Sequence, residues 1–427
     1  MDKDTIESLI QNYTETRYFN KKDIMYRLKP PTRIEEVWPV IRDYRKKHGW
    51  VTPLIDQQNN RFWFYLPQST INRLELIEKT ATDNIFQHAQ KSIQKSVVLE
   101  ALIDEAFNSS VIEGAFSTRK RTKEMVEKKL PPTNKSEQMI INNYKALDFI
   151  MQNLANPLNE DMILSVYKIL TENALDEGCE VEKYRNDLVF VSDVNSSQPI
   201  YTAPPHSEIQ TLMDSLIKFI NNPDDLHPVI KACIIHFYFA YIHPFFDGNG
   251  RTARAISYMY LLQKGYDFFK FFSISSVIRE QKTKYYKAIK ETEDYESDLS
   301  YFVNFDVEMI LDSILRIMEK FNQEYGYQLI LVYLNQSGII LSPRQKKALS
   351  IFLKADKNYT TIDEYAKKLK VTYETSRSDL NQLSELGLFK KSKISRRFVY
   401  TIIDHDDIMQ KFNDLKLSVI YGTVPPC

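Results

Sequence analysis

Cysteine is scarce in this chain. Its 427 residues include only Cys179, Cys233 and Cys427, and their spacing matches no common metal-binding motif. A sparse, odd number of cysteines excludes a disulfide-rich secreted scaffold and favours a reducing, cytoplasmic environment. Net charge is also absent, because 56 Lys and Arg residues balance 56 Asp and Glu residues. Any contact with nucleic acid must therefore come from a local basic patch.

Long hydrophobic runs are missing as well. The most apolar segment, Val229–Ile242, is interrupted by Lys231 and His236 and is too short to cross a bilayer, so it is predicted to be a buried helix. The first residues lack the basic stretch and apolar run of a signal peptide, and we expect neither a signal peptide nor a membrane partner. Hydrophobic residues make up 43% of the chain, which is enough for a sizeable core in two or three domains.

Helical periodicity dominates the middle of the chain. A helix is predicted from about residue 88 to 112, with Gly114 as its stop. Further helices are predicted over about 136–153, 159–173, 207–221, 228–242 and 249–264. One strand pair is expected within this block, Leu188–Val191 with Ile200–Thr202. The middle domain is thus predicted to be almost all helix with one hairpin.

The two ends of the chain follow other patterns. Within residues 1–90, Arg61–Leu66 is predicted to be a strand and a helical pattern follows it, which gives an N-terminal module of unassigned role. After about residue 326, three short helices are predicted before a strand: Arg344–Leu353, Ile362–Leu369, Tyr373–Leu386 and then Phe398–Ile402. Three helices followed by a β wing is the order of a winged helix-turn-helix.

The strongest chemical signal is the segment His243-Pro-Phe-Phe-Asp-Gly-Asn-Gly-Arg-Thr-Ala-Arg254. The glycines at 248 and 250 let backbone N–H groups approach an anion, and the start of the next helix adds a partial positive charge. Arg251 and Arg254 are spaced i, i+3 and share one face of that helix. Two arginines beside an anion-binding turn are typical of a triphosphate site.

Three further residues complete this reading. Asp247 is a hard oxygen ligand suited to Mg²⁺ that bridges phosphates. His243 lies just before the turn, where it can take a proton from an incoming hydroxyl. Phe245 is interpreted as a core anchor. A zinc site made by His236, His243 and Asp247 is the weaker alternative, because no cysteine or third histidine is nearby in the sequence.

Nine specified residues within twelve positions are unlike a chance arrangement, and His243–Arg254 resembles the complete signature of the Fic family, His-Pro-Phe-x-(Asp/Glu)-Gly-Asn-Gly-Arg-x-x-Arg. The resemblance implies a mainly α fold, a Fic-type helical bundle with a β-hairpin flap. It implies transfer of AMP from Mg-ATP to a Tyr, Thr or Ser hydroxyl of a target protein, including the chain itself. The implied roles are base for His243, Mg²⁺ ligand for Asp247, α- and β-phosphate cradle for Gly248, Asn249 and Gly250, phosphate support for Arg251 and γ-phosphate ligand for Arg254.

The resemblance extends over about residues 91–310, within a catalytic domain placed at 91–325. Tyr184-Arg-Asn186 and the hairpin before Pro204 and Pro205 are similar to the family's flap, which pairs by its edge with a target segment. Arg279 with Tyr285 and Tyr286 resembles the helix that borders the nucleotide base. His236 resembles a common family histidine and is interpreted as packing.

An inhibitory segment is predicted within about residues 91–114. Ser109-Ser-Val-Ile-Glu113-Gly114 resembles the family's inhibitory pattern, Ser/Thr-x-x-x-Glu-Gly/Asn. Ser109 and Glu113 are spaced i, i+4, so the hydroxyl is expected to orient the carboxylate. A carboxylate aimed at Arg254 would occupy the arginine that should hold the γ-phosphate. Alternatively, Glu113 is an exposed helical acid or a residue that positions water for AMP removal.

Residues 326–427 resemble winged-helix regulators. Residues that are candidates to face a groove or phosphates are Thr375, Ser376, Arg377 and Asn381, and a basic wing is formed by Lys390, Lys391, Lys393, Arg396 and Arg397. Asp363, Glu364 and Glu374 lower the local positive potential, so DNA binding and protein binding are both left open. A homodimer is expected from the resemblance. Removal of AMP, transfer of another nucleotide, and a DNA-binding regulator with a nucleotide-sensing Fic domain are the alternative functions, although the intact His243 argues against a mere sensor.

Overall fold

The computed structural model describes residues 3–82, 91–192, 199–336, 340–353, 357–394 and 397–403. The chain divides into two compact units, and the boundary falls between Ile314 and Leu315. Residues of the N-terminal module belong to the same unit as the helices that follow them. The division into an N-terminal module, a catalytic domain and a winged-helix domain stays a prediction about sequence domains. Within the described residues, no helix is long and apolar enough to cross a membrane.

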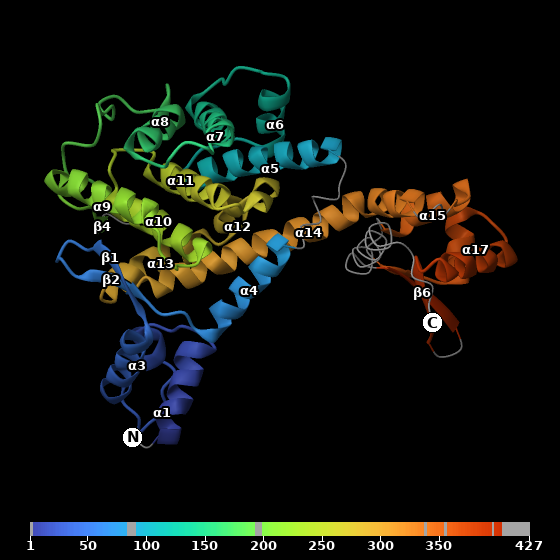
Figure 1. Ribbon diagram of the computed structural model, residues 1–427, viewed down its shortest axis with the longest axis horizontal. Coiled ribbons are helices and arrows are strands. Elements are labelled where there is room, and N and C mark those ends of the chain that lie inside the picture. The colour runs from blue at the N-terminus through green and yellow to red at the C-terminus, as the bar shows by residue number, and fades with distance from the viewer. Residues whose placement is uncertain are drawn as a thin grey trace. The chain divides into compact units, whose positions relative to one another are not determined.

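The first unit begins with short helices and a hairpin (Figure 1). These elements are α1 (Lys3–Ile10), the π-helix η1 (Gln11–Glu15), α2 (Lys21–Met25), α3 (Ile34–His48), β1 (Trp50–Ile55), β2 (Arg61–Phe64) and α4 (Gln68–Thr82). The predicted strand is β2, which ends two residues early, before the Leu66-Pro67 step. Backbone bonds fix this hairpin to the bundle: Trp63 N–H donates to the Ser297 carbonyl at 3.2 Å, and Leu299 N–H donates to the Trp63 carbonyl at 2.8 Å.

A bundle of helices makes the rest of the first unit. It contains α5 (Lys91–Ile112), α6 (Arg119–Glu127), α7 (Lys135–Gln152), α8 (Glu160–Thr171), α9 (Ile209–Asn221), α10 (Pro228–Ile242), α11 (Asn249–Gln263), α12 (Ile274–Glu280), α13 (Lys282–Asp294) and the start of α14 (Ser300–Gln336), with short 3₁₀ turns at His206–Glu208 and Asp267–Phe271. The helices predicted from periodicity in this block are confirmed, whereas α6 and α14 were not predicted. The single helix that the resemblance implied around Arg279, Tyr285 and Tyr286 is divided into α12 and α13. Residues 83–90, where the first of the predicted helices was expected to begin, lie outside the described residues.

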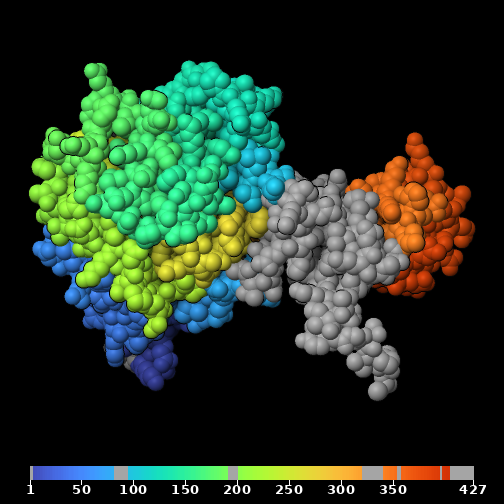
Figure 2. All heavy atoms as spheres, turned by 45° about the horizontal axis from the view of Figure 1, so that its top comes forward, coloured from blue at the N-terminus to red at the C-terminus, as the bar shows by residue number. Residues whose placement is uncertain are grey.

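Helices α10 and α11 are the centre of the bundle, and they pack against each other. Helix α10 is apolar all round, which is the pattern of a helix enclosed on every side, and nearly all of its side chains are buried. Most side chains of α11 are buried too. Residues of α6, α7 and α8 (teal and green) cover much of the face seen in Figure 2. The segment that connects α10 to α11 is therefore held at both ends by buried helices.

The hairpin inside this block pairs β3 (Phe190–Ser192) with β4 (Pro199–Thr202). The strands are antiparallel, with Phe190 opposite Thr202 and Val191 opposite Tyr201. The strand pair is confirmed with shifted ends, and most of the connecting residues lie outside the described residues.

The second unit contains the three helices and the strand that were expected after residue 326, in the expected order, together with two strands that were not predicted, β5 and β6. It contains α15 (Pro343–Leu353), β5 (Tyr359–Thr360), α16 (Ile362–Leu369), α17 (Tyr373–Glu385), β6 (Phe389–Ile394) and β7 (Arg397–Ile402), and its antiparallel sheet has the order β5-β7-β6. The assignment to winged helices stays a prediction. Of the candidate groove residues, Ser376 is fully buried. Asn381 is half-buried, and its Oδ1 accepts hydrogen bonds from Lys391 and Tyr400. Arg396 lies outside the described residues.

Candidate active site

His243 ends α10 in an unusual backbone conformation. Its φ is +51°, in the left-handed region that few residues other than glycine adopt, while its N–H donates to the Phe239 carbonyl at 3.1 Å. Arg185 holds this reversal from outside the helix. Its Nε donates to the His243 carbonyl at 2.8 Å, and its backbone N–H donates to the Pro244 carbonyl at 2.9 Å. The predicted flap segment thus fixes the backbone that presents the histidine.

The imidazole of His243 has a defined tautomer. Its Nδ1 lies 3.1 Å from the Ala240 carbonyl oxygen. Because a carbonyl only accepts, Nδ1 carries the proton and Nε2 keeps its lone pair. Burial lowers the pKa of His243 below its ordinary value, although the Ala240 hydrogen bond and the charge of Glu113 act in the opposite direction. The ring is therefore neutral at neutral pH, as a general base must be.

Asn249 ties the turn between the two helices together. Its Oδ1 accepts from the Phe245 N–H at 3.0 Å, and its Nδ2 donates to the Phe245 carbonyl at 2.8 Å. Phe245 is fully buried and stacks on Tyr167 with ring centroids 3.5 Å apart, as a core anchor should. The side chain of Asn249 is thus occupied within the turn. Within the turn, Asn249 therefore leaves to a phosphate its backbone and not its side chain, because the N–H groups that begin a helix have no partner inside it.

The two glycines of the turn have separate roles. Gly248 has φ +85°, which favours glycine, and an added Cβ would lie 2.9 Å from Thr171 Cγ2. An added Cβ on Gly250 would lie 2.2 Å from Glu113 Oε1. The carboxylate of Glu113 therefore lies directly against the backbone of Gly250, at the place where the motif predicts an anion.

Arg254 extends from α11 to the end of α5. Its Nε donates to Ser109 Oγ and its Nη2 to the Ser109 carbonyl, both at 2.9 Å. Nη2 also donates to Glu113 Oε1 at 2.8 Å. The expected contact of Arg254 with Glu113 is present. The expectation that Ser109 orients Glu113 is wrong, because the guanidinium lies between them and binds both.

Glu113 follows the last residue of α5, and Gly114 leaves the helix with φ +92°, as expected of a stop. Burial opposes ionisation of the carboxyl, but the guanidinium groups of Arg254 and Arg251 and the ammonium of Lys282 hold the pKa of Glu113 below its ordinary value. The carboxylate is therefore charged, and it is an anion set against a charged arginine.

Arg251 and Arg254 retain hydrogen-bonding capacity. Arg251 is fully buried; its Nη1 donates to the Leu170 carbonyl at 3.0 Å, and its Nη2 is 3.4 Å from Asp247 Oδ2. Within the described residues, Arg251 Nε and Arg254 Nη1 are buried without a hydrogen-bond partner. Two unmatched guanidinium N–H groups beside glycine N–H groups fit a polyphosphate.

The side chain of Asp247 is 38% exposed to solvent. Its Oδ1 accepts from the Gly248 N–H at 2.5 Å. One carboxylate beside a phosphate site fits Mg²⁺, which is usually held by one or two carboxylates and substrate phosphates. The described residues contain no cluster of three or more His, Cys, Asp or Glu that would hold a metal by itself.

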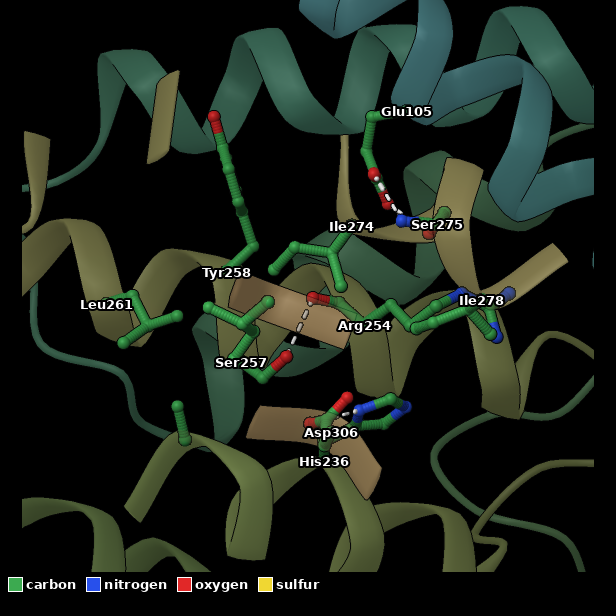
Figure 3. A pocket seen from close by; sticks show the side chains of 12 residues that line it. Glu105, His236, Arg254, Ser257, Tyr258, Leu261, Ile274, Ser275, Ile278 and Asp306 are labelled. Atoms are coloured by element: carbon green, nitrogen blue, oxygen red, sulfur yellow. Dashed lines mark hydrogen bonds and ion pairs between the residues drawn. The ribbon is translucent and has the colours of Figure 1, made fainter. Parts of the chain in front are cut away.

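The zinc alternative is excluded by the surroundings of His236. This residue is buried, and its nitrogens contact Asp306 Oδ2 at 3.3 Å and the Tyr285 hydroxyl at 3.1 Å. Figure 3 shows His236 and Asp306 together on the wall of a small cavity behind Arg254. Its volume is about 20 Å³, which suits about one water molecule and no nucleotide. His236 is a packing residue, as interpreted.

The predicted base-bordering residues divide between two surroundings. Tyr286 is 38% exposed, whereas Tyr285 is buried against His236. The Arg279 guanidinium lies 5.4 Å from the centre of the Phe107 ring, toward α5. Sequence patterns did not single out Glu105, whose carboxylate accepts from Ser273 and Ser275 at the start of α12. A single acidic residue within a predicted helix does not indicate such a contact.

Comparisons with known proteins bear on this geometry. The sequence model of the Fic/DOC family matches residues 157–261, a range that includes the hairpin, α10 and the whole motif. The chain contains a Fic domain. The fold is similar to that of a Fic family protein from Desulfovibrio desulfuricans, with a TM-score of 0.52 and 18% sequence identity over 78% of this chain and 96% of that one.

Curated relatives match part of this chain. The protein adenylyltransferase Fic of Nematostella vectensis is 28% identical over 193 residues, which cover 43% of this chain and 43% of the relative. That of Drosophila willistoni is 26% identical over 224 residues, or 51% of this chain and 42% of the relative. The chain thus spans less than half the length of these relatives.

Proposed function

We propose that this Fic chain is a self-inhibited protein adenylyltransferase that moves AMP from Mg-ATP to a hydroxyl of a target protein or of itself. The observation that carries the proposal is the arrangement of the turn. A neutral His243 with a free Nε2 precedes an anion-binding glycine pair and two arginines with unmatched N–H groups. The relatives named adenylyltransferase support the reaction class.

The residues divide the binding of the nucleotide between them. The backbone N–H groups around Gly248 and Gly250 would receive the α- and β-phosphates, and Arg251 would support them from its buried position. Arg254 would hold the γ-phosphate. Asp247 would hold Mg²⁺, which when bound neutralises phosphate charge.

The reaction then needs one base and one leaving group. His243 Nε2 would take the proton of the target hydroxyl as its oxygen attacks the α-phosphorus. The new oxygen–phosphorus bond forms while the bond from the α-phosphorus to the bridging oxygen breaks, and pyrophosphate leaves with both electrons of that bond. The Ala240 carbonyl stabilises the imidazolium that results, because it accepts a hydrogen bond from Nδ1–H throughout the reaction. General-base catalysis of this kind contributes roughly 10²–10⁴ in rate.

The resting state would be inhibited by Glu113. Its carboxylate contacts Arg254 and lies against Gly250, so the γ-phosphate cannot reach its arginine without displacing a like charge. Release of Glu113 would open the productive position. Removal of AMP by the same residues is an alternative outcome, and incubating adenylylated protein without ATP measures it.

Labelled ATP tests the proposed reaction directly. Incubation of Glu113→Gly with ATP labelled at the α-phosphate should transfer the label to protein, whereas ATP labelled at the γ-phosphate should not. Transfer of the γ-label would instead indicate a kinase, and transfer of neither by a folded, ATP-binding variant would refute the proposal.

A second candidate function, DNA binding, concerns the second unit. The strands β6 and β7 carry Lys391, Lys393 and Arg397 with exposed side chains, and Arg377 on α17 is also exposed. A gel shift at modest salt compares the wild type with Lys393→Glu/Arg397→Glu. The absence of a shift with either protein would exclude DNA binding, and equal shifts would exclude a contribution of Lys393 and Arg397 to it. The expected homodimer is tested by sedimentation of the wild type.

A further inference from the structure

Lys282, the first residue of α13, reaches the end of the inhibitory helix. Its Nζ donates to the Ile112 carbonyl oxygen at 2.6 Å. Ile112 is the last residue of α5 and directly precedes Glu113. Carbonyl groups in the last helical turn have no partner inside the helix, and a cation is favourable at that end. This contact joins segments that are 170 residues apart in the sequence.

The contact limits how Glu113 can move. On the helix side, the Glu113 N–H donates to the Ser110 carbonyl at 3.1 Å and the Gly114 N–H donates to the Val111 carbonyl at 3.1 Å. Lys282 holds the peptide between Ile112 and Glu113 from the other side. Its ammonium also lies 5.7 Å from the centre of the Tyr286 ring.

The charge of Lys282 favours the same position of the carboxylate. It is one of the positive groups that lower the pKa of Glu113, after the two arginines. Lys282 binds neither Arg254 nor the glycine turn, so it acts on the site only through the end of α5. This separates its role from that of the arginines.

We infer that Lys282 is a positioning residue that latches the end of α5 and so keeps Glu113 on Arg254. The inference rests on the proposed function and adds to its regulation. Because Tyr285 and Tyr286 follow on the same helix, a ligand or partner that shifts the start of α13 would pull the latch from α5. Inhibition would then be relieved at Lys282 and not at Glu113 itself.

Loss of the latch has a bounded effect. A hydrogen bond with a charged donor is stronger than one between neutral groups. Lys282 is exposed to solvent, and water can replace it at the Ile112 carbonyl, so a rise of about three- to tenfold in the population with Glu113 displaced is expected. The activity should rise by the same factor and stay below that of Glu113→Gly.

The test compares initial rates of self-adenylylation with Mg-ATP. Lys282→Met keeps the stem and removes the ammonium, while Lys282→Arg keeps a cationic donor. Lys284→Met is the matched control, an exposed neighbour that contacts neither α5 nor Glu113 among the described residues. We expect activation in Lys282→Met alone and rates near wild type in the other two. Lys282→Met/Glu113→Gly should match Glu113→Gly, because the latch acts only through Glu113.

Two results would overturn the latch. One is a Lys282→Met rate at or below wild type while Glu113→Gly is activated; the other is a double variant well above or below Glu113→Gly. The affinity for Mg-ATP, measured by calorimetry, separates a failure of the latch from a failure of the proposed function. If no variant transfers AMP, a three- to tenfold tighter binding by folded Lys282→Met still supports the latch, and unchanged binding refutes it.

Discussion

The substitution Glu113→Gly should destabilise the free protein and make its stability strongly dependent on ATP. It removes the partner of a buried arginine, and loss of one member of a buried ion pair usually costs about 3–5 kcal/mol. Here Arg254 keeps its two bonds to Ser109, and the Glu113 side chain is 25% exposed. We therefore expect a smaller loss, about 1–3 kcal/mol.

Thermal unfolding with and without Mg-ATP measures this effect. For a unit of this size about 1 kcal/mol corresponds to roughly 2–4 °C, so the free variant should unfold at a temperature lower by about 2–12 °C. Saturating Mg-ATP should raise the Tm of the variant more than that of the wild type, because the γ-phosphate replaces the missing carboxylate. Glu105→Gln, which keeps Arg254 paired, is the control for general loosening of α5. An unchanged Tm together with an equal ATP shift in both proteins would refute the proposed competition for Arg254.

Three further outcomes are expected. Burial raises the pKa of Glu293 to about 8, above its unfolded value. The contribution of Glu293 to stability is therefore complete below about pH 4.5 and is lost as the pH rises through 8. Glu293→Gln should flatten this decline in Tm scans from pH 5 to 9, and an unaltered decline would contradict the assignment. Because burial lowers the pKa of His243, self-adenylylation by Glu113→Gly should be flat above pH 7 and fall only below the ordinary histidine value of about 6.5; a loss that begins above pH 7 would argue against a neutral base. Asn249→Ala removes both side-chain bonds to Phe245 and should cost about 1–3 kcal/mol in chemical denaturation, whereas a change below about 0.5 kcal/mol would show that the turn is held otherwise.

Local patterns predicted the helices around the site well. The helix α10 is apolar on all faces and α5 ends two residues before a glycine, and both features are visible in a few consecutive residues. The motif itself located His243, Asp247 and the two arginines, because each role depends on a residue type at a fixed spacing. The short helices α6, α12 and α13 have mixed composition and depend more on tertiary packing, which a local pattern does not contain.

The contacts that hold the site in place could not be predicted from local sequence patterns. Arg185 and Lys282 act by donating to the backbone carbonyls of His243 and Ile112. Every residue has a backbone carbonyl, so the residue type does not indicate such a contact. The inhibitory pattern indicated that Ser109 and Glu113 both lie near the end of α5, as they do. It did not show that a guanidinium from α11 lies between them, since that depends on how the two helices pack.

Adenylyl transfer by His243 is tested most directly by the intact mass of two variants after incubation with Mg-ATP, Glu113→Gly and Glu113→Gly/His243→Ala. The first should gain mass equal to one or more AMP groups, and the second, equally folded and equally able to bind ATP, should gain none at the same time. Equal adducts on both proteins would contradict the assignment of His243 as the base. An absence of adducts on Glu113→Gly would contradict the adenylyl transfer itself.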